Sequence, residues 1–172
     1  MRLPFAALYN LLIPMFEIKR LNHAVLYVRD AGRVARFYQD VLGFVVATHM
    51  GDRAYFLKTS ANTTNNHDLG LFSIGPNAPD PTRGERVGLY HLAWQVDTLP
   101  ELANVRDALI QSDALVGVND HGSSLSLYAQ DPDGNEFEVF WMVPAEEWDT
   151  RKGGQLDIEG EMRKRGMQPV TA

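Results

Sequence analysis

Histidine, tyrosine and glutamate side chains gather in the second half of the chain, on two neighbouring stretches joined by a tight turn. The first stretch contains His121 and Tyr128, and the second contains Glu138. Two earlier histidines, His23 and His91, lie within alternating apolar runs of their own. Two imidazoles and one carboxylate can hold a divalent metal on one side and leave its other side open. A phenol and further imidazoles nearby could then carry out acid–base steps. This combination indicates a metal enzyme rather than a binding module.

The elements that would hold these residues occur twice along the chain. Each repeat has a strand, an amphipathic helix and three further strands, and its first strand carries a Leu, a His and a Val at matching positions. Gly43 follows the first helix, as expected for a helix C-terminus, and Pro100 falls in the first turn of the second helix. The first repeat is expected at 21–28, 32–42, 44–48, 54–58 and 67–74, and the second at 89–96, 97–112, 114–118, 124–128 and 136–141.

These repeats predict an α+β fold made of two βαβββ modules. Their sheets are expected to pair into a cupped, eight-stranded, barrel-like structure around a shared cavity. We place the domain at residues 18–143, with modules at about 18–74 and 86–143 and a linker rich in Pro, Gly, Asn and Asp between them. Residues 1–17 would be an N-terminal extension. Residues 144–172 would be a charged, peripheral C-terminal tail with a short helix at 158–164.

Strand periodicity supports a shared inner face for His23, His91 and Glu138. Side chains in a strand point alternately to opposite faces, and in all three strands the set opposite the proposed ligand is wholly apolar, as a helix-covered face requires. A lone histidine beside an apolar run is more often structural than a ligand. Here His23 and His91 occupy the same position in two copies, which makes a metal site with Glu138 the stronger interpretation. Glu136 is the rival carboxylate, but it directly follows the turn and is expected near the rim. The same alternation places Tyr128 inward.

Three further candidates are two histidines and an acidic turn. His67 is expected on the inner face together with Leu69 and Leu71. His49 has no such context and is expected at the surface. The segment Asp131–Gly134 has a composition that calcium-binding loops share, but it is too short for such a loop and is better explained as a turn.

The composition excludes several classes of function. With 172 residues, 45% of them hydrophobic, the chain is long enough to bury a substantial core. Its net charge of -6 argues against nucleic-acid binding, which requires a basic surface. The absence of cysteine excludes disulfides, thiolate metal sites and a cysteine nucleophile, and it fits a cytoplasmic protein.

The first 14 residues are apolar and faintly resemble a signal sequence. Pro4, Asn10 and Pro14 interrupt the apolar stretch, and no small-residue cleavage site precedes the first strand. The segment is also too short to span a bilayer. We therefore favour a functional start at Met15, or a loosely packed extension, over an export signal, and we expect no membrane partner.

Between about residues 18 and 143 the chain resembles the vicinal oxygen chelate superfamily, which contains glyoxalases, bleomycin resistance proteins and dioxygenases. Its members are built from paired βαβββ modules that carry a metal within a cupped sheet. Within the superfamily the sequence is most similar to the type I extradiol ring-cleavage dioxygenases, such as the catechol 2,3-dioxygenases. Four motifs carry this resemblance: LYHLAW at 89–94, NHDLGL at 66–71, DHGSSLSLY at 120–128 and DPDGNEFEVF at 131–140.

The resemblance implies iron-dependent ring cleavage. A catechol-type aromatic diol and O2 would give a ring-opened product of the muconic semialdehyde type. The implied Fe(II) ligands are His23, His91 and Glu138; His67 would be the acid–base or oxygen-stabilising group, Tyr128 would hydrogen-bond the substrate oxygen, and His121 would support the site. The same N/O donors also accept Mn(II), so the choice between iron and manganese stays open, as do the ring substituents.

The resemblance leaves the assembly less defined than the metal site. The well-known catechol enzymes have a longer chain with an additional, non-catalytic pair of modules, whereas this chain has only the catalytic pair. We expect a homo-oligomer in which each chain holds a complete site, although the superfamily also contains swapped dimers.

Three other functions occur in the same superfamily. Glyoxalase isomerases use four protein ligands, commonly with a carboxylate on the fourth strand of the first module, where this sequence is expected to offer only His67, Leu69 and Leu71. Thiol transferases acting on fosfomycin share the set of two His and one Glu, so the triad does not distinguish them. His67 and the His121–Tyr128 pair favour the dioxygenase. Non-catalytic drug-binding proteins of the bleomycin-resistance type need no metal triad, so its presence argues against them.

Overall fold

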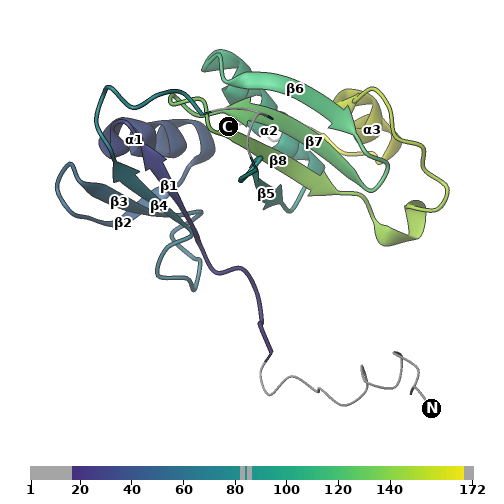
Figure 1. Ribbon diagram of the computed structural model, residues 1–172. Helices are drawn as coiled ribbons and strands as arrows, with labels where there is room; N and C mark the ends of the chain where they lie inside the picture. Colours follow the sequence, from purple (N-terminus) through teal and green to yellow (C-terminus); the bar gives the residue numbers. More distant parts are fainter. Residues whose placement is uncertain (1–16, 82–83, 85–86, 169–172) are drawn as a thin grey trace, which may run out of the picture.

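The computed structural model of the chain describes residues 17–81, 84 and 87–168. Nearly all of the expected N-terminal extension, including the proposed start at Met15, therefore lies outside the described residues. Two separate four-stranded sheets form the body of the molecule, each with a helix packed on one face (Figure 1). The α+β class and the repeated βαβββ unit are confirmed. Among the described residues, no helix is long and apolar enough to cross a membrane.

The first module has a sheet of order β1-β4-β3-β2, in which β1 and β4 run parallel and the other pairs antiparallel. Its elements are β1 (Ala24–Val28), α1 (Ala31–Leu42), β2 (Val45–His49), β3 (Ala54–Lys58) and β4 (Leu69–Ser73). The Asp30 side chain accepts a hydrogen bond from the backbone N–H of Arg33 at the start of α1. Gly43 ends α1 with a φ of 71°, which glycine adopts without a steric penalty.

The second module repeats this topology in the order β5-β8-β7-β6. Its elements are β5 (Leu92–Val96), α2 (Leu99–Gln111), β6 (Leu115–Asp120), β7 (Ser124–Gln130) and β8 (Glu136–Met142). Thr98 and Glu101 form a reciprocal capping box at the start of α2. The turn before β8 is the predicted one, because the Asp131 carboxylate accepts the backbone N–H groups of Asp133 and Asn135.

The modules contact each other through their helical layers and not through strand pairing. Helix α1 packs against α2, the rings of Phe37 and Phe137 lie 6.1 Å apart, and Phe44 meets Trp94 edge-on at 5.3 Å. In the described part of the chain no strand of one sheet pairs with a strand of the other, so β1 and β5 remain sheet edges. The sheets therefore do not close into one barrel-like structure, because aromatic residues on the helix-facing side of the second sheet pack against the first module.

Strand alternation follows the prediction in β8 and departs from it in β4. The three residues that alternate with Glu138 on β8 are buried under the helices, as expected. In β4, Leu69 and Leu71 are fully buried in the helix-side core, so the expectation that they point inward is wrong. Regular strand geometry begins only at Leu69, and alternation therefore cannot be extended back to His67.

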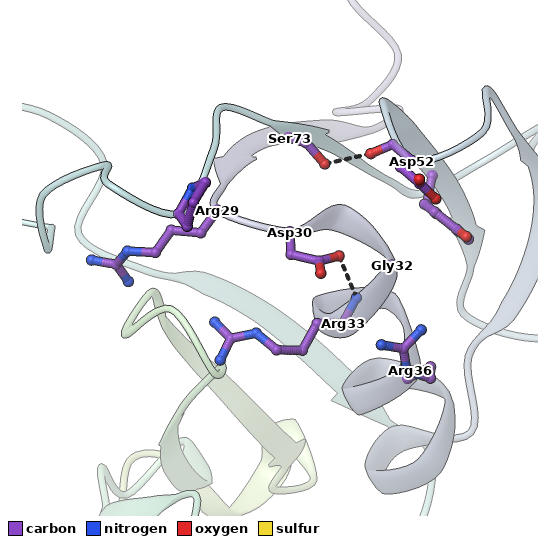
Figure 2. Close-up of a pocket in the computed structure, with 9 residues that line it drawn as sticks. Arg29, Asp30, Gly32, Arg33, Arg36, Asp52 and Ser73 are labelled. Carbon is purple, nitrogen blue, oxygen red and sulfur yellow. Dashed lines mark hydrogen bonds between the residues drawn. The ribbon is translucent and has the colours of Figure 1, made fainter.

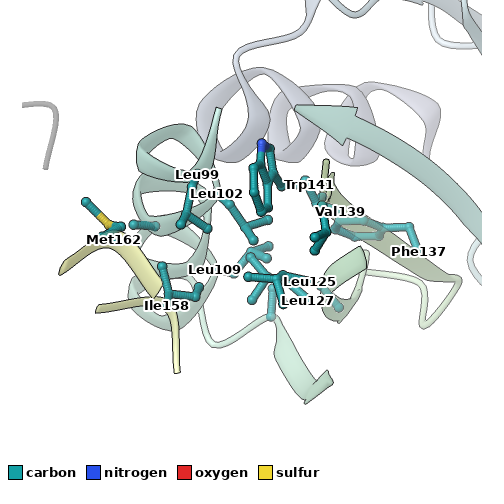
Figure 3. Packing of buried hydrophobic residues seen from close by; sticks show 14 residues of the cluster. Leu99, Leu102, Leu109, Leu125, Leu127, Phe137, Val139, Trp141, Ile158 and Met162 are labelled. Atoms are coloured by element: carbon teal, nitrogen blue, oxygen red, sulfur yellow. The ribbon is translucent and has the colours of Figure 1, made fainter. Parts of the chain in front are cut away.

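The C-terminal segment belongs to the core of the second module and is not peripheral. A short 3-10 helix, η3 (Ala145–Glu147), and α3 (Ile158–Lys164) follow β8, and α3 has the bounds expected from the sequence. Ile158 and Met162 are buried together with residues of α2, β7 and β8 (Figure 3). Their four-residue spacing places both on one helical face. Burial of two large apolar side chains, at roughly 1.5–3 kcal/mol each, explains why α3 docks.

Candidate metal and substrate site

His91 and Glu138 form a close donor pair on the second sheet. His91 directly precedes β5, and Glu138 lies on β8 beside Ala93 in the parallel register. The imidazole Nε2 is 3.2 Å from the carboxylate Oε2. The other ring nitrogen, Nδ1, is buried and has no hydrogen-bond partner among the described residues, so the contact with Glu138 orients the ring. One imidazole nitrogen and one carboxylate oxygen at this spacing suit a shared divalent cation.

His121 and Tyr128 form a second polar pair beside the first. His121 lies in the turn between β6 and β7, and its Nε2 is 2.8 Å from the Tyr128 hydroxyl. Tyr128 lies opposite Glu138 in the antiparallel register, and its ring centroid is 5.8 Å from that of His91. Burial and the nearby negative charge of Glu138 raise the pKa of Tyr128, so the phenol keeps its proton at neutral pH. A neutral phenol can donate a hydrogen bond to a bound oxygen.

Two side chains that the sequence analysis did not single out join these pairs. The Asn119 amide nitrogen lies 3.1 Å from Nδ1 and 3.4 Å from Nε2 of His121, and such similar distances place it against the ring rather than in line with one lone pair. Tyr90 packs its ring 4.8 Å from that of His91. Both had a signal in the sequence. Tyr90 adjoins a proposed ligand, and Asn119 stands two positions before His121, the spacing of one strand face.

His23 and His67 gather on the first sheet instead. Their ring centroids lie 4.4 Å apart, and the His67 ring meets Phe56 edge-on at 5.2 Å. Partial burial and the neighbouring His23 lower the pKa of His67, and together they outweigh the opposing effect of the Asp68 carboxylate. His67 is therefore mainly neutral at pH 7, with a nitrogen lone pair that can accept a proton.

The single chain does not bring His23 to His91 and Glu138. Within the described ranges, no three His, Asp or Glu side chains converge where they could hold a metal ion. The prediction that each chain holds a complete site is therefore not met. The physical reason is the module contact, in which Trp94 and α1 join the modules on the helix-facing side of the sheets. The structure contains two half-sites, which we call the His23–His67 half-site and the His91–Glu138 half-site.

The surface assignment of His49 is confirmed, and Glu136 lies on the same strand as Glu138. His49 is exposed and stacks on Tyr55 at 5.2 Å. Glu136 opens β8 and is partly buried, two positions before Glu138 on the same strand face. Of the two carboxylates on this face, that of Glu138 lies beside the imidazole of His91.

A cavity of about 700 Å³ lies at the N-terminal end of α1 and shares no lining residue with either half-site (Figure 2). Arg29, Arg33 and Arg36 contribute to its wall. Arg29 and Arg33 are already paired with Asp133, a buried residue of the turn before β8. These ion pairs join the two modules, a role that the sequence analysis missed because it explained Asp133 only as part of a turn. The cavity is thus a cleft beside a structural contact.

Residues 20–139 match a family described as the Glyoxalase/Bleomycin resistance protein/Dioxygenase superfamily. Over 163 residues the chain is 29% identical to a catechol-2,3-dioxygenase of Bacillus subtilis, an alignment that covers 91% of this chain and 55% of that protein. Over 125 residues it is 34% identical to biphenyl-2,3-diol 1,2-dioxygenase 3 of Rhodococcus globerulus, covering 70% and 62% respectively. The chain therefore spans 55% of the length of the first of these relatives and 62% of the second.

Solved structures share the fold. A fosfomycin resistance protein of Listeria monocytogenes superposes with a TM-score of 0.56 over 77% of this chain and 99% of its own, at 18% sequence identity. A likeness at this level of identity supports the paired-module fold and does not choose between functions.

Proposed function

Because the chain belongs to the glyoxalase/bleomycin resistance protein/dioxygenase superfamily, we propose that it is an Fe(II)-dependent dioxygenase that cleaves a catechol-type ring beside its two hydroxyl groups. One observation carries the proposal. The His91–Glu138 donor pair lies next to the His121–Tyr128 pair, with the His91 and Tyr128 rings 5.8 Å apart. A metal-binding pair beside a neutral phenol suits the chelation and orientation of an aromatic diol. The identities of 29% and 34% to two dioxygenases support the same reaction class.

The chemistry of the donor set fits the metal. Imidazole and carboxylate donors suit Fe(II) and also Mn(II), and His91 and Glu138 would hold the ion together with His23. When bound, the metal would supply the electron transfer between the diol and O2 that ring cleavage requires. Three protein ligands leave positions for the substrate, so a fourth protein ligand is not needed.

We further propose that a second copy of the chain completes the site. The edges of β1 and β5 are unpaired in the described part of the chain, and His23 and His91 each stand directly before one of them. Two chains related by a twofold axis could pair β1 with β5 twice and so form two equal sites. Leu21 and Leu89, each two positions before the histidine, are 80% and 66% exposed. A second copy would remove this apolar surface from water.

Charge favours the same arrangement. The positive charge at the His23–His67 half-site is the guanidinium of Arg20, which is linked to His23 through hydrogen bonds of two Asn side chains. The opposite half-site carries the carboxylates of Glu136 and Glu138. Because His23 and His67 lie 4.4 Å apart, a second copy would bring the third ligand and an acid–base group together. Complementary charge of this kind guides association and fixes its register.

The other residues would hold protons and orient the substrate. Tyr128 would donate its hydroxyl proton in a hydrogen bond to a diol oxygen, and its raised pKa keeps that proton in place. His121, 2.8 Å from the hydroxyl, would fix the direction of the phenol. His67, mainly neutral, would take a diol proton and return it as the ring opens.

A glyoxalase-like isomerase fits the residues less well. The inner-face positions of β4 are Gly70 and Phe72, and neither can supply the carboxylate that such a site uses. A thiol transferase of the fosfomycin type would use the same three ligands. No contact of the described residues favours it over the dioxygenase, and a fosfomycin-plus-thiol assay therefore belongs beside the catechol assay.

The proposal is tested by oxygen uptake of anaerobically iron-loaded protein across a panel of catechols, with product absorbance followed in the near-ultraviolet and visible. We expect O2 consumption and ring-opened product in equal amounts from at least one catechol. Glu138→Gln should lose most of the bound iron, whereas the matched variant Glu136→Gln, on the same strand face, should retain it. Iron-loaded protein that consumes no O2 with any catechol, or that instead joins a thiol to fosfomycin, would contradict the proposal.

A further inference from the structure

The C-terminal segment is bonded to the turn that carries His121. Asp120, the last residue of β6, exchanges two backbone hydrogen bonds with Gly154. The N–H of Asp120 donates to the Gly154 carbonyl at 3.2 Å, and the N–H of Gly154 donates to the Asp120 carbonyl at 2.8 Å. The segment is therefore paired with β6 at the point where the chain turns into His121.

Arg151 holds the same turn through its side chain. Its Nη2 is 2.6 Å from the Asp120 Oδ2, and its Nη1 is 3.0 Å from the Glu161 Oε1 on α3. The other oxygen of Asp120, Oδ1, accepts the backbone N–H of Gly122 at 2.8 Å. The Asp120 carboxylate therefore bonds to the backbone on the far side of His121, at Gly122. The Arg151 guanidinium joins this carboxylate to Glu161 on α3. Charge-assisted hydrogen bonds of this kind are short and directional.

Glycines make the contact close. A Cβ atom at Gly153 would lie 2.5 Å from the Asp120 carbonyl oxygen and 3.1 Å from the His121 carbonyl carbon, so a larger residue would push the turn away. Gly122 has a φ of 83°, a conformation that few other residues adopt readily. The backbone on both sides of His121 is therefore held against the C-terminal segment.

The far end of this contact is anchored in the core. Glu161 is only 5% exposed, and its carboxylate is shared between Arg151 and Arg165, the latter at 2.8 Å. Helix α3 is itself fixed by the burial of Ile158 and Met162. A rigid chain of contacts therefore runs from the core of the second module to the His121 turn.

We propose that Arg151 is a positioning residue for the His121–Tyr128 pair. It lies 31 residues from Asp120 in the sequence, touches neither ring in the described contacts, and acts by fixing the turn so that the His121 Nε2 stays 2.8 Å from the phenol. The kinetic consequence rests on the proposed function. The effect on the His121 ring does not, and the two can be measured separately.

Arg106 provides a matched control. It also ties α3 to the body of the protein, with its Nη1 2.6 Å from Glu159, but its other partner is Asp107 on α2, and among the described residues it forms no hydrogen bond or ion pair with the His121 turn. The Arg106 and Arg151 side chains are 22% and 15% exposed. Arg106→Gln and Arg151→Gln therefore remove equal charge from the attachment of α3, and only Arg151→Gln releases the turn.

The experiment combines NMR of the imidazole signals in metal-free protein with iron analysis and catechol kinetics. In Arg151→Gln we expect the His121 ring signals to shift while those of His91 stay in place. Iron content should remain that of the wild type, and kcat should fall about tenfold or more, as expected when a positioning contact is lost. Arg151→Lys should recover part of the loss. Arg106→Gln should leave the His121 signals and kcat unchanged.

The His121 signals test the positioning role of Arg151 independently of catalysis. Unmoved His121 signals in Arg151→Gln would overturn the proposal, whether or not the protein cleaves catechols. Equal shifts of the His121 signals in both variants would also overturn it, because the effect would then follow the attachment of α3 in general. If Arg151→Gln does not fold, Asp120→Asn weakens the same ion pair and should shift the same signals. Shifted signals in a protein without catechol cleavage would support the positioning role and contradict the proposed function.

Discussion

A phenol that keeps its proton beside a carboxylate limits what the candidate site can do at the level of single residues. Burial and the charge of Glu138 raise the pKa of Tyr128, so phenolate chemistry is disfavoured at neutral pH and hydrogen bonding is what remains. His121 is 2.8 Å away and occupies one side of the hydroxyl. In the proposed reaction, the hydroxyl proton would be donated to a substrate oxygen.

Removal of this hydroxyl should separate substrate binding from metal binding. In Tyr128→Phe we expect wild-type iron content, since Tyr128 is not a proposed ligand. A hydrogen bond to a charged oxygen contributes roughly 1.5–3 kcal/mol, so catechol affinity should fall roughly 10- to 150-fold. Iron analysis and steady-state kinetics measure the two effects. Tyr55→Phe, which alters a tyrosine stacked on His49 outside the site, should change neither. Wild-type affinity in Tyr128→Phe would remove the phenol from the proposed mechanism.

Strand alternation was sufficient to find the His91–Glu138 pair, because both residues lie in or directly before regular strands of the same sheet. The same rule misplaced Leu69 and Leu71, because β4 starts only at Leu69 and the preceding backbone is irregular. The link from Arg151 to the His121 turn could not be predicted at all, since it depends on how a distant segment docks.

At the level of elements, the sequence predicts where helix α3 begins and ends but not where it packs. Its bounds, 158–164, were predicted from the sequence, and the structure shows the Asp157 side chain capping its first turn. The surface on which α3 packs could not be predicted, because the local pattern of a seven-residue helix does not identify its partner. The decisive contacts are the burial of Ile158 and Met162 and the ion pairs of Glu161 with Arg151 and Arg165.

Glu161 should make this docking sensitive to acid. Burial acts to raise the pKa of Glu161, but hydrogen bonds from Arg151 and Arg165 outweigh it and leave the pKa lowered. The unfolded chain therefore binds this proton more readily than the folded one. The stability that Glu161 provides is full above the ordinary glutamate pKa and is lost as the pH falls through that value to the lowered pKa of the folded state.

We therefore expect the difference in urea midpoint between the wild type and Glu161→Gln to be largest near neutral pH and to shrink in acid. Glu159→Gln is the matched control, because Glu159 is largely exposed and its pair with Arg106 contributes about 0–1 kcal/mol. If the difference in urea midpoint between the wild type and Glu161→Gln stays constant as the pH falls, the Glu161 carboxylate of the wild type does not contribute to stability in this way.

For the whole molecule, the separation of the two half-sites predicts complementation between chains. His23→Ala removes a donor from one half-site, and Glu138→Gln removes one from the other. Neither variant alone should bind iron at the wild-type level. A refolded equal mixture should regain about a quarter of the wild-type iron, because half of randomly formed twofold dimers are mixed and one of the two sites in each is intact.

Iron analysis and light scattering measure this outcome, with a chain mass of 19.3 kDa as the reference. An iron-loaded wild type of single-chain mass, together with no recovery in the mixture, would mean that each chain forms its own site. That arrangement was expected because both His-bearing modules and the carboxylate belong to one polypeptide, joined by a linker that could fold one module back on the other. The contact of Phe44 and α1 with the second module, which the sequence does not reveal, decides how the two sheets are set relative to each other.

The contact between Phe44 and Trp94 also gives the molecule an internal optical signal. The Trp94 indole N–H is buried without a partner among the described residues, and its ring meets Phe44 edge-on at 5.3 Å. An indole in such apolar surroundings fluoresces at shorter wavelengths than one in water. The other two tryptophans, Trp141 and Trp148, lie in the second module and its C-terminal segment. Parting of the two modules would therefore move the emission of one tryptophan to the red and leave the other two unchanged, so that the chain reports its own opening without an added dye.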